Sequence, residues 1–455
     1  MSSRNRLVLR VWWSMLCAAA LVCAPSRLRA QEPDPHAGHQ APAQPTDPHA
    51  GHAAGQDDAA HVMLGPGDLP MSRIGSGTSW IPENSLMRGV MATPGDWTVM
   101  LMGQAFGQVL REGGFFGGTQ GGSINWGMLM GQRRIGRGWL LLSGMASAEP
   151  VTIPGCGYPN MLATGELCEG KPIHEKQHPH DAVMELAASF TWPVREGVYA
   201  QVYGGPAGEP ALGPAAFPHR ASSLVNPMSP IAHHWLDATH ITYGVATAGV
   251  FTGRWKAEAS VFNGREPDEN RTDLDLARMD SYSGRLWWTP SPAWALQVSA
   301  GHLHEAEPPH EDLSTVDRNL VTASVSYNRR LTRQDGLWAS TVAWGYAREA
   351  GSAPTQFVLA ETAFARDAHD TWYGRAELGT KTPHDLSIHG LTAAQGLGKL
   401  QGGYVRHLGL WKGWQPGVGF TVSAAVTNAL LASRYGGRVT YGGGVFVNIR
   451  PGVMR

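Results

Sequence analysis

The sequence predicts an all-β protein, a transmembrane antiparallel β-barrel of about sixteen strands with short periplasmic turns and long extracellular loops. Three observations lead to this fold class. Apolar and polar residues alternate with period two in one segment after another, as expected of strands with one apolar face. Aromatic residues stand at the starts of many apolar faces, where an interfacial girdle would lie. Short connections alternate with long ones along the chain, which is typical of an outer-membrane barrel.

The stretch "HPHDAVMELAASFTWPV" (178–194) illustrates the alternation, although it contains many good helix formers. Met184 and Leu186 share the apolar parity and Glu185 takes the other, which predicts a strand between lipid and lumen. In "WKAEASVF", Trp255 opens the apolar face and charged residues occupy the opposite face. The side chains expected to line a water-filled lumen are Glu185, Lys256, Glu258, Arg285, Glu361, Arg375 and Glu377.

Composition divides the chain into five parts. Residues 1–30 combine early arginines with an apolar run too short for a membrane anchor, which predicts a cleaved signal peptide. Residues 31–62 are rich in Pro, Ala, Gln and His, which predicts a disordered periplasmic tail. A linker or partial plug is expected over 63–96, the barrel over 97–449 and a short C-terminal tail over 450–455.

The net charge limits the partners. Without residues 1–30 the chain has 31 basic and 37 acidic residues, a net charge of −6, which excludes a basic surface for nucleic acid. The expected partners are outer-membrane lipid and small solutes or metal ions, with the chain as a monomer or small homo-oligomer. Cys156 and Cys168 remain after cleavage, and an oxidising compartment favours a disulfide between them. A zinc site is the alternative, but it would lack a second thiolate pair.

The N-terminal tail repeats the sequence "DPHAGH" and so carries four closely spaced histidines, His36, His39, His49 and His52. Imidazoles beside aspartates are good ligands for copper, nickel or zinc, so these ions are the candidate bound groups, although none is required for the fold. The alternative interpretation is a solvated linker whose histidines bind nothing.

A second set of histidines and aspartates lies at expected strand ends, in "QHPHD" and "HHWLDATH": His178, His180, Asp181, His233, His234, Asp237 and His240. Two helical turns over 233–240 would place His233, Asp237 and His240 on one face. Three interpretations stay open, namely loop hydrogen bonds inside the lumen, a lumen metal site, and a hydrolytic His–Asp pair with Ser222 or Ser223.

Several motifs resemble those of an uncharacterised family of Gram-negative outer-membrane β-barrel proteins, from Gly75 to the C-terminus: "QHPHDAVMELA", "GEPALGPAAFPHR", "HHWLDATHITYGV", "FNGREPDENR", "DSYSGRL" and "WALQVS". The resemblance implies a barrel in the cell outer membrane with its tail in the periplasm, and it carries over no catalytic residue. The His-rich tail is also similar in composition to B-type copper-resistance outer-membrane proteins, but their methionine-rich tail repeats are absent here.

The leading functional hypothesis is an outer-membrane channel or porin-like protein for small solutes or ions, with a link to transition-metal (copper) handling. A metal-sequestering surface protein is the alternative, with its barrel plugged by residues 65–95 and the loop 205–238. A barrel hydrolase is the third hypothesis, and no enzymatic activity is expected from the first two.

Overall fold

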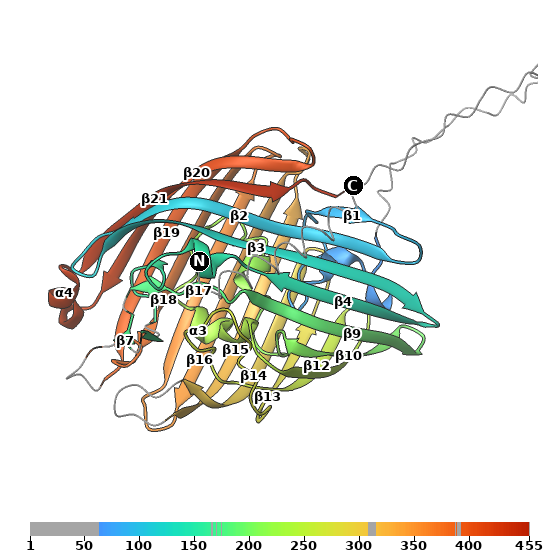
Figure 1. Ribbon diagram of the computed structural model, residues 1–455, viewed down its shortest axis with the longest axis horizontal. Helices are drawn as coiled ribbons and strands as arrows, with labels where there is room; N and C mark the ends of the chain where they lie inside the picture. Colours follow the sequence, from blue (N-terminus) through green and yellow to red (C-terminus); the bar gives the residue numbers. More distant parts are fainter. Residues whose placement is uncertain are drawn as a thin grey trace, which may run out of the picture.

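Sixteen antiparallel strands form a closed barrel in the computed structural model (Figure 1). The structure describes residues 63–164, 167–169, 171–173, 175–307, 315–386, 388 and 393–454. The barrel strands are β2 (Thr98–Glu112), β3 (Gly118–Ile135), β4 (Gly138–Ala146), β9 (Val183–Arg195), β10 (Val198–Ala207), β11 (Val245–Phe251), β12 (Trp255–Phe262), β13 (Ser281–Trp288), β14 (Trp294–Glu307), β15 (Val316–Arg330), β16 (Leu337–Glu349), β17 (Thr355–Ala365), β18 (Asp370–Lys381), β19 (Gln395–His407), β20 (Trp414–Thr427) and β21 (Val439–Pro451).

The barrel closes where the first strand meets the last. Residues 105–112 of β2 pair with residues 442–449 of β21, and β2 pairs along its whole length with β3. The short strand β1 (Val90–Ala92) pairs with residues 99–101 of β2, beyond the point at which β21 leaves it. Each remaining barrel strand is hydrogen-bonded to its neighbour in the sequence of strands, so the sheet has no free edge. The predicted fold class and strand number are confirmed.

The remaining elements are short and lie in the connections. Two small hairpins pair β5 (Tyr158–Pro159) with β8 (Lys176–Gln177) and β6 (Leu167–Cys168) with β7 (Lys171–Pro172). The helices are α2 (Glu149–Thr152), α3 (His233–Leu236) and α4 (Ala429–Tyr435), with 3-10 turns η1 (Pro66–Asp68), η2 (Met71–Arg73), η3 (Phe217–His219) and η4 (Ala238–His240). None of the helices in the described ranges is long and apolar enough to cross a membrane. Figure 1 places α4 at one end of the barrel and β1 with the C-terminus at the other.

The period-two alternation separates an apolar exterior from an enclosed interior. In β12 the odd-numbered residues are exposed and the even-numbered ones are buried. Large apolar side chains are likewise exposed outward on other strands, among them Leu286, Val298, Val342, Leu400 and Val422. So much exposed apolar surface around the whole barrel is suited to a lipid environment.

Aromatic side chains form a belt near the rim with the short turns. Trp255 stacks on Trp288 across β12 and β13, with ring centroids 5.3 Å apart. Trp294 contacts Tyr327 at 4.6 Å, and Tyr327 contacts Trp338 at 5.8 Å. Amphipathic rings at one level of a barrel are typical of a membrane interface, as the sequence predicted.

A β-bulge in β9 corrects one feature of the predicted alternation. Glu185 pairs with Met145 and Val183 pairs with Ala146, so Met184 has no partner in β4. The extra residue shifts the parity locally. Met184 therefore points into the barrel and is fully buried, although its parity predicts contact with lipid, and Glu185 remains inside.

Two long segments fold into the barrel, and part of the connection between β4 and β9 packs inside with them. The "N-terminal segment" (residues 63–89) enters from the rim with the short turns, where Asn84 N donates to Pro292 O at 3.0 Å. The "inner loop" (residues 208–244) connects β10 to β11, and none of its 37 residues is exposed. In Figure 1 the inner loop, with α3, lies within the outline of the barrel. A connection this long and this buried is unusual, because its backbone polar groups need partners inside the protein.

Candidate functional site in the barrel interior

Arg285, on β13, joins the barrel wall to both interior segments. Its Nε donates to Glu258 Oε1 at 2.9 Å, its Nη1 to Gly213 O at 2.9 Å and its Nη2 to Thr78 Oγ1 at 3.2 Å. Gly213 belongs to the inner loop and Thr78 to the N-terminal segment. Lys256 Nζ lies 2.9 Å from Glu258 Oε2 and donates to Thr78 O at 2.5 Å. This group of side chains therefore holds the two segments against the same side of the wall.

A second buried network is centred on Glu361 of β17. Arg220 of the inner loop donates from Nε to Glu361 Oε1 at 2.7 Å and from Nη1 to Asp237 Oδ2 at 2.8 Å. Arg375 of β18 donates from Nε to Glu361 Oε2 at 3.1 Å and from Nη2 to Ser223 Oγ at 2.6 Å. One wall carboxylate thus pairs with one guanidinium from the wall and one from the inner loop.

The other predicted lumen residues are also engaged. Glu377 accepts a hydrogen bond from Ala232 N at 2.9 Å, and Glu185 accepts one from Tyr203 Oη at 3.0 Å. All seven charged side chains predicted to line the lumen do face the interior, but each is at most 7% exposed. Protein therefore takes the place of the water expected around them, because the inner loop and the N-terminal segment occupy that space.

Glycines permit the inner loop to approach the wall. A Cβ added at Gly345 of β16 would lie 2.3 Å from Trp235 O in α3, which is far inside contact distance. Within the loop, Gly213 has a φ of +78°, and a Cβ there would lie 2.0 Å from Leu236 O. The inner loop is further fixed by Trp235 Nε1, which donates to Thr355 Oγ1 at 2.9 Å. Side chains larger than hydrogen at these two glycines would displace α3 from the wall.

Three of the predicted histidines meet around one aromatic ring inside the barrel. His233 begins α3, His240 ends η4 and His180 lies just before β9. The ring centroids of His233 and His240 are 4.9 Å apart, and those of His180 and His240 are 5.5 Å apart. Phe217 contacts all three imidazoles at centroid distances of 5.7 to 6.0 Å. We call these three residues the "histidine cluster".

Each imidazole of the histidine cluster is fixed through its Nδ1 atom. His180 Nδ1 lies 2.9 Å from Glu149 Oε2, and His233 Nδ1 lies 2.8 Å from Asp237 Oδ1. His240 Nδ1 lies 2.9 Å from Asp237 O, so it donates there, and its buried Nε2 has no hydrogen-bond partner. A proton held on Nδ1 leaves the lone pair of Nε2 free to bind a metal ion or accept a proton.

The electrostatics of the cluster differ from one histidine to the next. Burial lowers the pKa of His240 well below its ordinary value, and burial also lowers the pKa of His233. For His180, burial is outweighed by the Glu149 carboxylate, so its pKa is raised. For Asp237, burial is outweighed by Arg220, and its pKa is lowered. A neutral His240 beside an ionised Asp237 is the form suited to bind a cation.

The other predicted ligands lie outside the histidine cluster. His178 Nδ1 is 3.0 Å from Pro179 O, and His234 Nε2 is 3.2 Å from Glu266 Oε1. Asp181 lies 3.7 Å from Arg271 Nη1, and burial raises its pKa to about 6. The tail histidines His36, His39, His49 and His52 lie outside the described residues.

The Nε2 atoms of the histidine cluster do not converge on one point. In the part of the chain that the structure describes, one group of three His, Cys, Asp or Glu residues has its ligand atoms within 4.8 Å of one another, and that group is Asp268, Asp273 and Asp275. These aspartates lie in the connection between β12 and β13 and are mostly exposed. The imidazoles would have to rotate before they could share an ion.

The serines of the hydrolase hypothesis are engaged elsewhere. Ser222 Oγ lies 2.8 Å from Thr341 Oγ1 and donates to Glu361 Oε1 at 3.0 Å. Ser223 Oγ accepts from Arg375. A nucleophile would need a histidine base within hydrogen-bond reach, and these contacts give the two hydroxyls a structural role instead.

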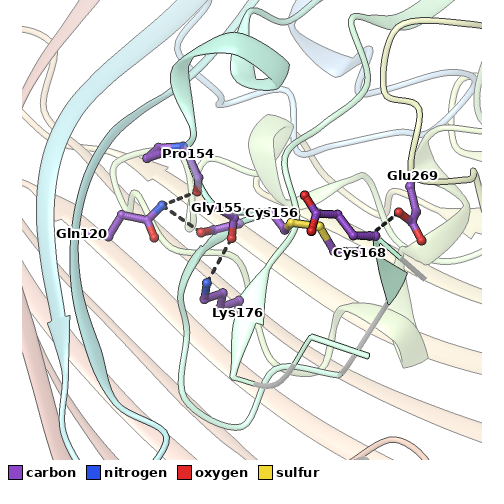
Figure 2. Close-up of a disulfide and its surroundings, with 9 residues drawn as sticks. Gln120, Pro154, Gly155, Cys156, Cys168, Lys176 and Glu269 are labelled. Atoms are coloured by element: carbon purple, nitrogen blue, oxygen red, sulfur yellow. Dashed lines mark hydrogen bonds between the residues drawn. A yellow bond between two sulfur atoms is a disulfide. The ribbon is translucent and has the colours of Figure 1, made fainter. Parts of the chain in front are cut away.

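The predicted disulfide between Cys156 and Cys168 is present, with 6.0 Å between the Cα atoms (Figure 2). It lies in the long connection between β4 and β9. Around it, Gln120 Nε2 donates to Pro154 O at 2.9 Å and Lys176 Nζ donates to Gly155 O at 3.0 Å. The bridge therefore closes a ring within this connection in which Met161 and Leu162 are buried, and the three residues of the histidine cluster lie outside that ring.

Sequence reasoning missed three residues that shape the cluster. Glu149 and Arg220 fix His180 and Asp237, and Phe217 fills the space between the rings. Phe217 and Arg220 stand in "AAFPHR", a motif quoted only for its resemblance. A buried arginine cannot be recognised from sequence, because its partners are brought together by folding alone.

No family model matches the chain, and no curated protein sequence matches it. Similar solved structures include the anion-selective porin from Comamonas acidovorans, at 10% identity, over 78% of this chain and 99% of that one, with a TM-score of 0.47. Another is OmpF of Salmonella typhi in complex with daunomycin, at 9% identity, over 79% and 100%, with a TM-score of 0.47. A third is OmpT, an outer membrane protein of Vibrio cholerae, at 6% identity, over 79% and 100%, with a TM-score of 0.46.

Proposed function

We propose that the protein is an outer-membrane barrel that is closed to free diffusion by its own interior segments and that binds transition-metal ions. The observation that carries the proposal is that no residue of the inner loop is exposed, together with the ion pair of the loop to the wall. In an open pore the charged side chains of the wall would be in contact with water, whereas here they form hydrogen bonds and ion pairs with other groups of the protein.

The closed state is supported by the cost of undoing the buried networks. Removing one partner from a buried ion pair costs about 3–5 kcal/mol, because the other charge is left unpaired. Arg220 joins the inner loop to Glu361 of the wall through such a pair, and Arg285 of the wall donates a buried hydrogen bond to Gly213 O of the loop. Displacing the loop would break both networks together, so the interior segments should act as a stable plug.

Metal binding is supported by two sets of histidines, one in the barrel interior and one in the sequence of the N-terminal tail. The histidine cluster offers Nε2 lone pairs inside the barrel, and its Nδ1 atoms are already held by Glu149 and Asp237. The tail adds four histidines in repeated "DPHAGH" motifs. By the Irving–Williams order, copper(II) should bind such ligands more tightly than nickel or zinc.

Titration calorimetry with copper(II) tests this function. We compare the full chain with a variant lacking residues 31–62, with His233→Gln/His240→Gln, and with His302→Gln/His304→Gln as a matched control outside the cluster. The tail deletion should lose most of the bound copper, the cluster variant a smaller and tighter fraction, and the control nothing. Uptake should fade as pH falls through about 6.5, because imidazoles must be neutral to coordinate. Unchanged binding in both test variants would refute the metal-binding function.

A channel for small solutes is the second candidate function. It is favoured by the barrel size, since sixteen strands can enclose an aqueous pathway once interior segments move aside. In that case the inner loop would act as a gate instead of a permanent plug. A measurement of conductance across a lipid bilayer distinguishes a gated channel from a plugged barrel.

A further inference from the structure

Ten of the sixteen methionines of the chain gather in one place inside the barrel. Six of them are buried core residues, and four more pack against these at partly buried positions. The buried ones are Met71, Met100, Met128, Met130, Met145 and Met184, and the others are Met63, Met87, Met102 and Met454. Of these ten residues, the predictions from sequence used only Met184, and they placed it on the lipid-facing side of its strand.

A cavity of about 110 Å³ lies within this methionine cluster. Six of the methionines line it: Met71, Met87, Met100, Met102, Met128 and Met130. Four come from the paired strands β2 and β3, where Met100 is opposite Met130 and Met102 is opposite Met128. Met71 and Met87 come from the N-terminal segment. The cavity is therefore walled by thioethers from the barrel on one side and from the plug on the other.

His219, from the inner loop, completes the lining of the cavity. Its ring lies 4.9 Å from that of Trp126, and its buried Nε2 has no hydrogen-bond partner. Burial lowers the pKa of His219 to about 4, so the imidazole is neutral at physiological pH. A neutral, unpartnered nitrogen among thioethers is a ligand set that soft metal ions prefer.

We propose that this cavity binds a soft monovalent metal ion, Cu(I) in the cell, through methionine thioethers and Nε2 of His219. The proposal deepens the metal-binding function proposed above and rests on it, but it assigns a second, chemically different site. The histidine cluster and the tail offer nitrogen ligands that suit Cu(II), whereas thioethers select Cu(I) and its analogue Ag(I).

Two arginines at the cavity argue for a monovalent ion. Arg88 and Arg450 also line it, and both donate to Gln415 Oε1, at 3.2 Å from Arg88 Nη1 and at 3.1 Å from Arg450 Nη2. Repulsion between these guanidinium groups and a bound cation grows with the charge of the cation. The neutral thioethers offer no charge to offset it, so a divalent ion is disfavoured relative to Ag(I) or Cu(I).

Methionine is also a common filler of irregular cores, because its side chain is flexible and polarisable. The experiment must therefore distinguish sulfur that binds a metal from sulfur that only packs. We use Ag(I) with the chain from residue 31 onward, which lacks Cys17 and Cys23, in detergent and in buffer free of chloride and of reductant. Without reductant the Cys156–Cys168 disulfide stays closed, so sulfur bound to silver can come only from methionine.

X-ray absorption at the silver edge, with one equivalent of Ag(I), reports the ligand atoms directly. We expect sulfur scatterers in the wild-type spectrum and a lower number of them in Met100→Leu/Met128→Leu, which conserves side-chain volume. Met145→Leu/Met184→Leu is the matched control, since these two methionines belong to the same cluster but do not line the cavity. The control should keep the wild-type spectrum.

A wild-type spectrum with only nitrogen and oxygen scatterers would overturn the proposal, even if the cavity variant failed to fold. Sulfur scatterers that persist unchanged in Met100→Leu/Met128→Leu would overturn it as well. The outcome is separable from that of the copper(II) titration. Sulfur-bound silver with no copper(II) uptake would refute the histidine sites and support the methionine site. Copper(II) uptake without sulfur-bound silver would support the histidine sites and refute the methionine site.

Discussion

Arg220, in the loop that fills the barrel, donates a hydrogen bond from Nε to Oε1 of Glu361 on the barrel wall at 2.7 Å, and both side chains are almost fully buried. This contact joins residues 141 positions apart in the sequence. It links the inner loop to a strand on which the sequence alone predicted a water-exposed charge. The closed interior depends on contacts of this kind.

We expect Arg220→Gln to lower the free energy of unfolding by about 3–5 kcal/mol, because it leaves Asp237 and part of Glu361 without a buried cation. Arg333→Gln is the matched control, since its side chain is 68% exposed and 3.9 Å from Asp367. A surface pair is worth about 0–1 kcal/mol. Urea unfolding in detergent measures the free energy of unfolding of both variants. Equal decreases in the two variants would contradict the role of Arg220 in holding the inner loop to the wall.

The lipid-facing surface gives a second test. Leu400 lies in the middle of β19 and is 57% exposed, while Leu410 lies in the following turn and is 64% exposed. We expect Leu400→Arg to cost about 2–4 kcal/mol, as a charge near the bilayer midplane does, and Leu410→Arg to cost about 0–1 kcal/mol. Folding yields in lipid vesicles measure the difference. Similar yields for the two variants would argue against a membrane around β19.

The interior should also respond to pH through Glu209 of the inner loop. Burial raises the pKa of Glu209 to about 8, with Arg285 opposing the shift. Between pH 4.5 and about 8 the folded state keeps a proton that the unfolded state releases, so the free energy of unfolding falls as pH rises. In the wild type, this decrease in the free energy of unfolding should be on the order of a few kcal/mol over the window, and we expect it to be absent in Glu209→Gln. Thermal unfolding at several pH values checks it, and parallel pH profiles for the two proteins would disprove it.

The disulfide should stabilise only its own loop. Cys156 and Cys168 should resist alkylation until a reductant is added, and Cys156→Ser/Cys168→Ser should lose about 3 kcal/mol of local stability. Hydrogen exchange should then rise in the connection between β4 and β9 while the barrel strands stay protected. Free thiols in protein purified under oxidising conditions would contradict the bridge, as would a general loss of protection.

Much of the fold could be predicted because a barrel repeats one simple pattern. Period-two alternation indicated which residues face outward, as Leu186 and Trp255 do. The exception is Met184. It lies at a β-bulge that depends on how β9 pairs with β4, and the local sequence does not indicate this bulge. Such a local bulge does not interrupt the period-two pattern of the strand as a whole. The predicted number of strands was therefore correct, although the predicted orientation of Met184 was wrong.

The interior could be predicted only in part. His233 and Asp237 do pair at a helical spacing, and His180 does contact His240, because the sequence placed these histidines at strand ends that face the interior. The burial of the inner loop was not predictable in detail, since a packed loop has no periodic pattern. Arg285 illustrates this, because its partners Thr78 and Gly213 are far from it in the sequence.

Single-channel recording in planar lipid bilayers tests the closed interior most directly. We expect the inserted full chain to give no steady open steps, because the inner loop and the N-terminal segment occupy the lumen. Arg220→Gln should produce openings in the same membrane, since it weakens the contact between the inner loop and the wall, and Arg333→Gln should stay silent. Steady open conductance from the unmodified chain at insertion would contradict the plugged barrel and favour the channel.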